Sequence, residues 1–200
     1  MNRYGIIILA AGASTRLGQP KQLLQWKGKS LLQHAVETAG ELIKPLVVLG
    51  ANGEQLKAEL DPATVNIVHN PSWQEGIASS IRCGLYAFLN EEDPFPELVI
   101  FMVCDQPYVT AGLLRELISE HQKTGKAIVA SAYENTIGIP ALFDKRIFVQ
   151  LLDLQGDTGA KKIIQKNADQ LATVSFPQGN IDIDTSEEYL ELVRNQKPEV

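Results

Sequence analysis

The sequence turns from an apolar run to a small-residue loop at Ile6-Ile7-Ile8-Leu9-Ala10-Ala11-Gly12-Ala13-Ser14-Thr15-Arg16-Leu17-Gly18-Gln19-Pro20-Lys21. The apolar run is rich in β-branched residues, which predicts a strand covered on both faces of a sheet. The loop holds two glycines, so its backbone N–H groups can approach an anion, and Arg16 and Lys21 add positive charge. At the carboxyl end of a parallel strand, this combination predicts a polyphosphate site. The competing interpretation is a plain turn with two solvent-facing cations.

Apolar runs and helical patterns alternate along the rest of the chain. Further strands are predicted at 46–49, 65–68, 98–103 and 127–130. Four helices are predicted to begin near capping residues or capping boxes, at Ser30 with Gln33, Ser72 with Glu75, Thr110, and Thr185 with Glu188. This alternation predicts an α/β fold with a mostly parallel sheet and helices on both faces.

The composition limits the classes of function. The 200 residues suit a single domain, 1–200, with a polar tail at 195–200. A net charge of −6, from 18 basic and 24 acidic residues, argues against nucleic acid as a partner. Cys83 and Cys104 lie too far apart for a CxxC motif and fit a reducing compartment. The apolar run near the N-terminus is too short for an export signal or a membrane span, so a cytoplasmic protein without a membrane partner is expected.

The predicted strand at 98–103 is followed directly by Cys104-Asp105-Gln106-Pro107. An acid just past a buried strand, at the same sheet edge as the first loop, is a suitable ligand for a hard cation. Asp105 is therefore predicted to bind Mg²⁺, which would bridge phosphate oxygens. The alternative is an aspartate that caps the turn before Pro107.

A third segment reads Asn70-Pro71-Ser72-Trp73-Gln74-Glu75-Gly76-Ile77-Ala78-Ser79-Ser80. Gly76, Ser79 and Ser80, predicted to lie in the first turns of a helix, leave room for a flat base and supply hydroxyls. Because glycine within a helix costs about 1 kcal/mol relative to alanine, a packing or ligand reason is expected at Gly76. The alternative is simple helix capping at Ser72.

The last segment of interest is Ile181-Asp182-Ile183-Asp184-Thr185. Alternation places Asp182 and Asp184 on one side of an extended chain, where they could complete a metal site. The alternative is negative charge that complements the dipole of the following helix.

Together, these segments resemble the signature of nucleotidyltransferases of the molybdenum cofactor family, most closely its cytidylyltransferase branch. Matching blocks in family order are Leu9 to Lys21, Asn70 to Ser79, Cys104 to Pro107, Gly138 to Phe143, Leu154 to Ala160 and Asp182 to Thr185. The resemblance implies a Rossmann-like three-layer sandwich of the glycosyltransferase-A type. It also implies transfer of CMP from CTP to molybdopterin with release of pyrophosphate. The pair Ala10-Ala11 is similar to the CTP-using branch.

The resemblance and the residue chemistry together imply a role for each site residue. The catalytic group is Arg16, Lys21 and Asp105. Nucleotide binding is expected from Leu9, Ala10, Ala11, Gly12, Ser14, Asn70, Gly76 and Ser79. Acceptor binding is expected from Gln106, Gly138, Pro140, Gly156 and Asp157. Mg²⁺ is the expected cofactor, on Asp105 with Asp182 or Asp184. An acceptor phosphate is already ionised near neutral pH, so no general base is expected.

Two other functions stay open. Ile139 stands where relatives often carry histidine, which keeps a different phosphorylated acceptor, such as a sugar or alditol phosphate, under consideration. The other is a non-catalytic carrier that delivers molybdenum cofactor to a client molybdoenzyme. The carrier interpretation does not explain why Arg16, Lys21 and Asp105 occur together.

Overall fold

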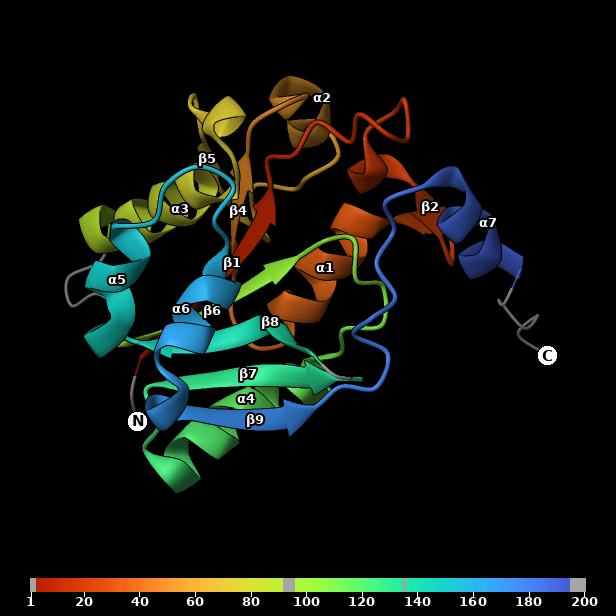
Figure 1. Cartoon of the computed structure of the whole chain (residues 1–200). Coiled ribbons are helices and arrows are strands. Elements are labelled where there is room, and N and C mark those ends of the chain that lie inside the picture. Colours follow the sequence, from red (N-terminus) through yellow and green to blue (C-terminus); the bar gives the residue numbers. More distant parts are fainter. Residues whose placement is uncertain (1–2, 92–95, 135, 195–200) are drawn as a thin grey trace.

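The computed structural model describes residues 3–91, 96–134 and 136–194, and the predicted polar tail at 195–200 lies outside them. A seven-stranded sheet in the order β5-β4-β1-β6-β8-β7-β9 forms the centre (Figure 1). Its strands are β1 Tyr4–Ala10, β4 Leu46–Leu49, β5 Asn66–His69, β6 Leu98–Val103, β7 Ile128–Tyr133, β8 Thr136–Asp144 and β9 Leu171–Ser175. A separate hairpin consists of β2 Gln25–Trp26 and β3 Lys29–Ser30. The helices are α1 Leu31–Gly40, α2 Gly53–Lys57, α3 Ile77–Glu91, α4 Ala111–Thr124, α5 Phe148–Leu152, α6 Ala160–Lys166 and α7 Ser186–Arg194.

Side-chain alternation along β1 divides the core into two layers. Ile6 and Ile8 pack with α1, α2 and α4 on one face, whereas Ile7 and Leu9 pack with α3, α5 and α6 on the other. All four side chains are buried, which accounts for the uninterrupted apolar run. Figure 1 shows helices on both sides of the sheet. The predicted α/β sandwich is therefore confirmed.

Strand β8 runs antiparallel to both of its neighbours, β6 and β7. The sequence did not predict this strand, because Gly138 and Pro140 interrupt it and both residues are uncommon in strand interiors. Its register with β6 ends at the pair Phe101 and Ala141, next to the proline that lacks an N–H group. Strand β9, which pairs in parallel with β7, was also missed. The sheet is still mostly parallel.

Three of the four predicted helix caps are present in the structure. The capping box of Ser30 with Gln33 and the Thr110 cap are both present. The Glu188 carboxylate accepts a hydrogen bond from Thr185 N at 2.7 Å, as the predicted box requires. The cap at Ser72 was wrong: its side chain makes no cap bond, and residues Trp73–Glu75 form a single 3-10 turn.

A small third core holds the C-terminal segment against the hairpin. Ile183 and Leu192 pack with Leu24, Trp26 and Leu31, and all five side chains are buried. This cluster positions α7 beside β2 (Figure 1). Within the part of the chain that the structure describes, no helix is both long and apolar enough to cross a bilayer.

Candidate active site

The loop after β1 is organised by Gln22, a residue that the sequence analysis did not select. Its side chain is 1% exposed and donates to Ala10 O at 3.1 Å and to Gly12 O at 2.9 Å. Ser14, predicted to bind nucleotide, donates to Gln22 Oε1 at 3.3 Å and accepts from Lys21 N at 3.0 Å. The Ser14 hydroxyl therefore serves the internal structure of the loop. The only sequence signal for Gln22 is its position directly after Lys21.

Lys21 joins two acids that lie far away in the sequence. Its Nζ donates to Asp105 Oδ2 and, at 2.7 Å, to Asp184 Oδ1. Arg16 Nη1 lies 3.6 Å from Asp184 Oδ2, but its side chain is 77% exposed. A backbone bond of 3.1 Å from Ile183 N to Asp105 O connects the C-terminal segment to the end of β6. The structure thus brings the three predicted catalytic residues to one side of the site.

The charges of this cluster stabilise one another. Burial alone would lower the pKa of Lys21, but Asp105 and Asp184 outweigh it and hold that pKa above its ordinary value. The hydrogen bond from Lys21 lowers the pKa of Asp184, and the charges of Lys21 and Arg16 act in the same direction. Burial raises the pKa of Asp182, with repulsion from Asp105 and Asp184 adding to the effect. A cation near Asp182 would relieve that repulsion.

The acids fit a divalent cation in donor chemistry. Asp105 Oδ1 is buried and has no hydrogen-bond partner in the structure, so one carboxylate oxygen remains available. Carboxylate oxygens are the ligands that Mg²⁺ prefers. Among the described residues, however, no three acidic, histidine or cysteine side chains already form a metal cluster. The Lys21 ammonium provides the positive charge between Asp105 and Asp184 instead.

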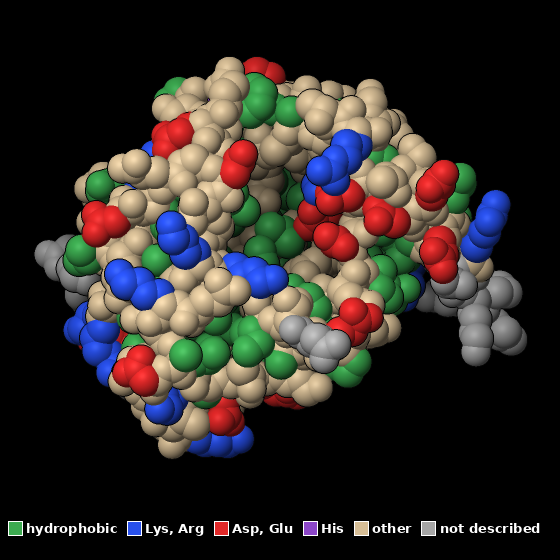
Figure 2. Space-filling view, viewed as in Figure 1, with side chains coloured by type: hydrophobic (Ala, Val, Ile, Leu, Met, Phe, Trp, Pro, Cys, Tyr) green, Lys and Arg blue, Asp and Glu red, His purple; other side chains and the backbone are tan. Residues whose placement is uncertain are grey.

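A cavity of about 330 Å³ opens beside this cluster. It is lined by the predicted nucleotide-binding residues Leu9, Ala10, Ala11, Gly12 and Gly76, by Lys21 and Asp105, and by the predicted acceptor residue Asp157. Ser80, which was predicted to supply a hydroxyl, also lines it, as does Trp73, which was not predicted as a site residue. Figure 2 shows a hollow in this face, with acidic side chains gathered on one side. The cavity thus brings together residues predicted to bind the nucleotide and a residue predicted to bind the acceptor.

Gly76 allows the far wall of the cavity to close. It lies before α3 and not within it, with φ of 116°, so the predicted helical position was wrong. A Cβ atom there would meet Asp157 Oδ1 at 2.3 Å and the Gly156 carbonyl at 2.6 Å. Ala78 N donates to Gly156 O at 3.2 Å, which attaches this turn to the start of α3. The expected packing reason for glycine is therefore contact with the turn at Gly156 and Asp157.

Asn70 and Ser79, both predicted to bind nucleotide, belong to a buried network next to that wall. The Asn70 side chain donates to Ser79 Oγ at 2.8 Å and to Ser80 Oγ at 3.1 Å. Ser79 in turn donates to Gly76 O at 2.8 Å. Both side chains are at most 3% exposed. In the structure they support the wall around Gly76 and do not line the cavity.

Four of the five predicted acceptor residues do not line the cavity, and Asp157 is the exception. Pro140 O accepts from Ser131 Oγ at 2.7 Å inside the sheet. A Cβ atom on Gly138 would lie 2.6 Å from the Tyr133 hydroxyl. Gln106 is 8% exposed and donates to Gly179 O at 3.1 Å, which connects the segment before Asp182 to the end of β6. None of these three residues lines the cavity beside Asp105, and neither does Gly156.

Comparison with known proteins finds a family that matches most of the chain. The model of the family described as "MobA-like NTP transferase domain" matches residues 6–172. The nicotine blue oxidoreductase of Paenarthrobacter nicotinovorans is 28% identical, covering 94% of this chain and 95% of that protein. The molybdenum cofactor cytidylyltransferase of Escherichia coli K12 is 22% identical, covering 95% of each.

A solved structure agrees with the fold. Rv0371c from Mycobacterium tuberculosis H37Rv superposes with a TM-score of 0.81 at 25% identity, covering 97% of this chain and 99% of that one. A second structure of Rv0371c is a complex with manganese, and it superposes with a TM-score of 0.79 at 23% identity, covering 96% of this chain and 99% of that one.

Proposed function

Because the chain belongs to the MobA-like NTP transferase domain family, we propose that it transfers CMP from CTP to molybdopterin and releases pyrophosphate. The family is one of nucleotidyltransferases, and the Escherichia coli relative carries this activity in its name. The pair Ala10-Ala11, which resembles the CTP-using branch, lines the cavity and supports cytosine as the base.

One observation carries the proposal: a single cavity brings together Gly12, Lys21, Asp105 and Asp157. A small-residue loop with a lysine suits a triphosphate, and a buried carboxylate suits the metal that accompanies it. Asp157 lines the same cavity next to Gly76, and we expect the acceptor to enter past it.

The proposed reaction is an in-line attack of the acceptor phosphate on the α-phosphorus of CTP. Backbone N–H groups between Ala11 and Ser14, together with Lys21 and Arg16, would hold the triphosphate in position. Asp105, with Asp182 or Asp184, would hold Mg²⁺, which when bound neutralises charge on the phosphates. The manganese complex of Rv0371c supports a divalent cation in this family.

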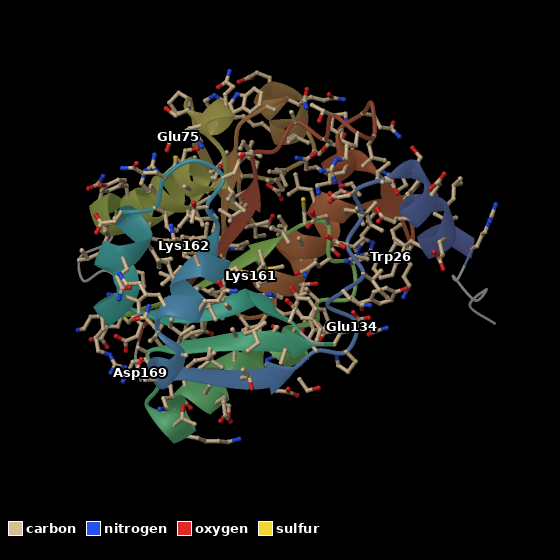
Figure 3. All side chains as sticks on the ribbon, in the orientation of Figure 1. Trp26, Glu75, Glu134, Lys161, Lys162 and Asp169 are labelled. Carbon is tan, nitrogen blue, oxygen red and sulfur yellow. The ribbon has the colours of Figure 1, made fainter. Side chains whose placement is uncertain are left out.

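The test is pyrophosphate release by the purified protein with Mg²⁺ and molybdopterin, comparing CTP, GTP, ATP and UTP. We expect release with CTP and a loss of at least about 100-fold in kcat for Asp105→Asn, since a metal ligand is removed. Asp169→Asn is the matched control, because Asp169 is exposed and lies away from the hollow (Figure 3). Equal activity of the two variants would contradict the role of Asp105.

The remaining functions give different results in the same assay. Pyrophosphate release with a sugar or alditol phosphate but not with molybdopterin would establish the other acceptor class. Tight molybdopterin binding without turnover would favour the carrier. The Paenarthrobacter relative is named as an oxidoreductase, and an oxidoreductase activity of this chain would give no pyrophosphate release with any of the four triphosphates.

A further inference from the structure

We infer that Lys161 binds the phosphate group of the acceptor and so selects a phosphorylated acceptor. This inference rests on the proposed transfer reaction. Lys161 is exposed on α6, whose neighbouring residues Ala160 and Ile163 are buried against the sheet. Its backbone position is therefore fixed, while its side chain is exposed to solvent.

The contacts of Lys161 place it at the edge of the sheet where the site lies. Its Nζ donates to Thr136 Oγ1 at 2.8 Å. Thr136 is the first residue of β8, and because β8 is antiparallel to β6, β8 begins at the edge where β6 ends before Asp105. The turn that precedes α6 is held at Gly156 by Ala78 N. Figure 3 shows Lys161 near the centre of the face in which the hollow of Figure 2 opens, although Lys161 does not itself line the cavity beside Asp105.

The charges around the hollow leave Lys161 as the cation suited to an incoming anion. Lys21 and Arg16 already face carboxylates, and Arg82 is paired with Glu75 at 2.7 Å. Among the residues that the structure describes, no carboxylate lies within ion-pair distance of Lys161. A lysine ammonium has three N–H donors, and the Thr136 hydroxyl takes one of them.

An acceptor phosphate needs such a cation for a physical reason. It must approach a triphosphate that is itself anionic, beside the acids Asp105, Asp182 and Asp184. Repulsion from that side raises the free energy of the acceptor unless positive charge stands on the other wall. An ammonium is a strong point-charge ligand for phosphate. A hydrogen bond from Lys161 to a phosphate dianion is stronger than its hydrogen bond to the neutral Thr136 hydroxyl, so the exchange favours binding of the acceptor.

The test compares Lys161→Gln, Lys161→Arg and the matched control Lys162→Gln. Lys162 is also exposed on α6, but consecutive helical residues do not face the same way, and Figure 3 shows it displaced from Lys161. The probe is inorganic phosphate, titrated by ³¹P NMR onto protein saturated with Mg²⁺ and the α,β-methylene analogue of CTP. With the triphosphate site filled, the phosphate reports on the acceptor side. Circular dichroism checks that each variant is folded.

We expect Lys161→Gln to raise the phosphate Kd about fivefold to tenfold, with Lys161→Arg and Lys162→Gln within about twofold of the unmodified protein. The KM for the acceptor should rise in parallel, with the KM for CTP unchanged. An unchanged phosphate Kd in Lys161→Gln, an equal rise in both Gln variants, or no phosphate binding at all would overturn the inference. Failure of the unmodified protein to release pyrophosphate with molybdopterin would instead reject the proposed function, and the phosphate titration would still decide the role of Lys161.

Discussion

At the scale of single residues, the first loop is shaped by a side chain that carries no motif. Gln22 satisfies the carbonyls of Ala10 and Gly12 and holds Ser14 in place. Buried backbone carbonyls need such partners, since an unpaired one costs about 1–3 kcal/mol. Periodicity and spacing select charged and glycine positions, whereas a buried glutamine that serves backbone groups has no periodic signal. Only the folded loop identifies it.

The steric requirement at Gly76 gives a prediction at the same scale. Gly76→Ala places a Cβ against Asp157 and Gly156 at positive φ, so we expect a loss of about 1–3 kcal/mol in stability. The affinity for CTP should fall as well, because the displaced turn lines the cavity. Urea unfolding and calorimetric titration with CTP measure the two effects.

Gly40 provides the control for that substitution. It is exposed at the end of α1, and a Cβ there would meet nothing within 4 Å. Gly40→Ala should leave CTP affinity unchanged and stabilise the protein by up to about 1 kcal/mol. Equal behaviour of the two variants would contradict the steric role of Gly76.

At the scale of elements, α7 holds the acid Asp184 next to Lys21. Leu192 is 3% exposed in the third core, whereas Leu190 on the same helix is 50% exposed. We expect Leu192→Ala to cost about 2–5 kcal/mol in the local stability of α7, because it removes buried apolar surface. Amide hydrogen exchange over residues 186–194 measures this loss, and the apparent Kd for Mn²⁺ should rise with it.

Leu190→Ala should change neither measurement, since substitutions at exposed positions usually stay within about 0.5 kcal/mol. An α7 that exchanges as slowly in Leu192→Ala as in Leu190→Ala would show that the third core does not hold this helix in place.

At the scale of the whole molecule, a polar junction ties the sheet to α4 at the edge opposite the site. Asp144 Oδ1, at the end of β8, accepts a hydrogen bond from Arg146 Nε at 2.9 Å. His121 Nε2 on α4 lies 3.9 Å from Asp144 Oδ2. Arg146 also donates to Gly125 O at 3.0 Å. Burial alone would raise the pKa of Asp144, but the hydrogen bonds and charge of Arg146 outweigh it and hold the pKa below its ordinary value.

This junction predicts a pH-dependent contribution to the free energy of unfolding. Because the pKa of Asp144 is lower in the folded state, its stabilisation is present above the unfolded pKa of about 4 and is lost as the pH falls through the folded value. Asp144→Asn should therefore cost about 1–3 kcal/mol at pH 7. Urea unfolding between pH 7 and pH 3 should show the difference shrink in acid, with kcat at pH 7 unchanged. A difference that stays constant with pH would contradict this account.

The alternation of strands and helices was readable from the sequence because buried parallel strands are apolar throughout and helices carry a repeating apolar face. The loop after β1, Asp105 and the acids at 182 and 184 were proposed as site residues because each follows or precedes such an element. Strand β8 was not found, since glycine and proline interrupt it and its antiparallel direction depends on its neighbours.

The sequence by itself therefore determined the alternation of apolar strands and amphipathic helices, without β8 and β9, and the chemical type of each candidate site residue. Only the tertiary structure decided which of these residues meet. Lys21 reaches Asp105 and Asp184 across 84 and 163 positions of sequence, and no local pattern encodes such contacts. They arise because parallel strands end at one edge of the sheet, and because the backbone bond from Ile183 to Asp105, the bond from Gln106 to Gly179 and the third core hold the C-terminal segment at that edge.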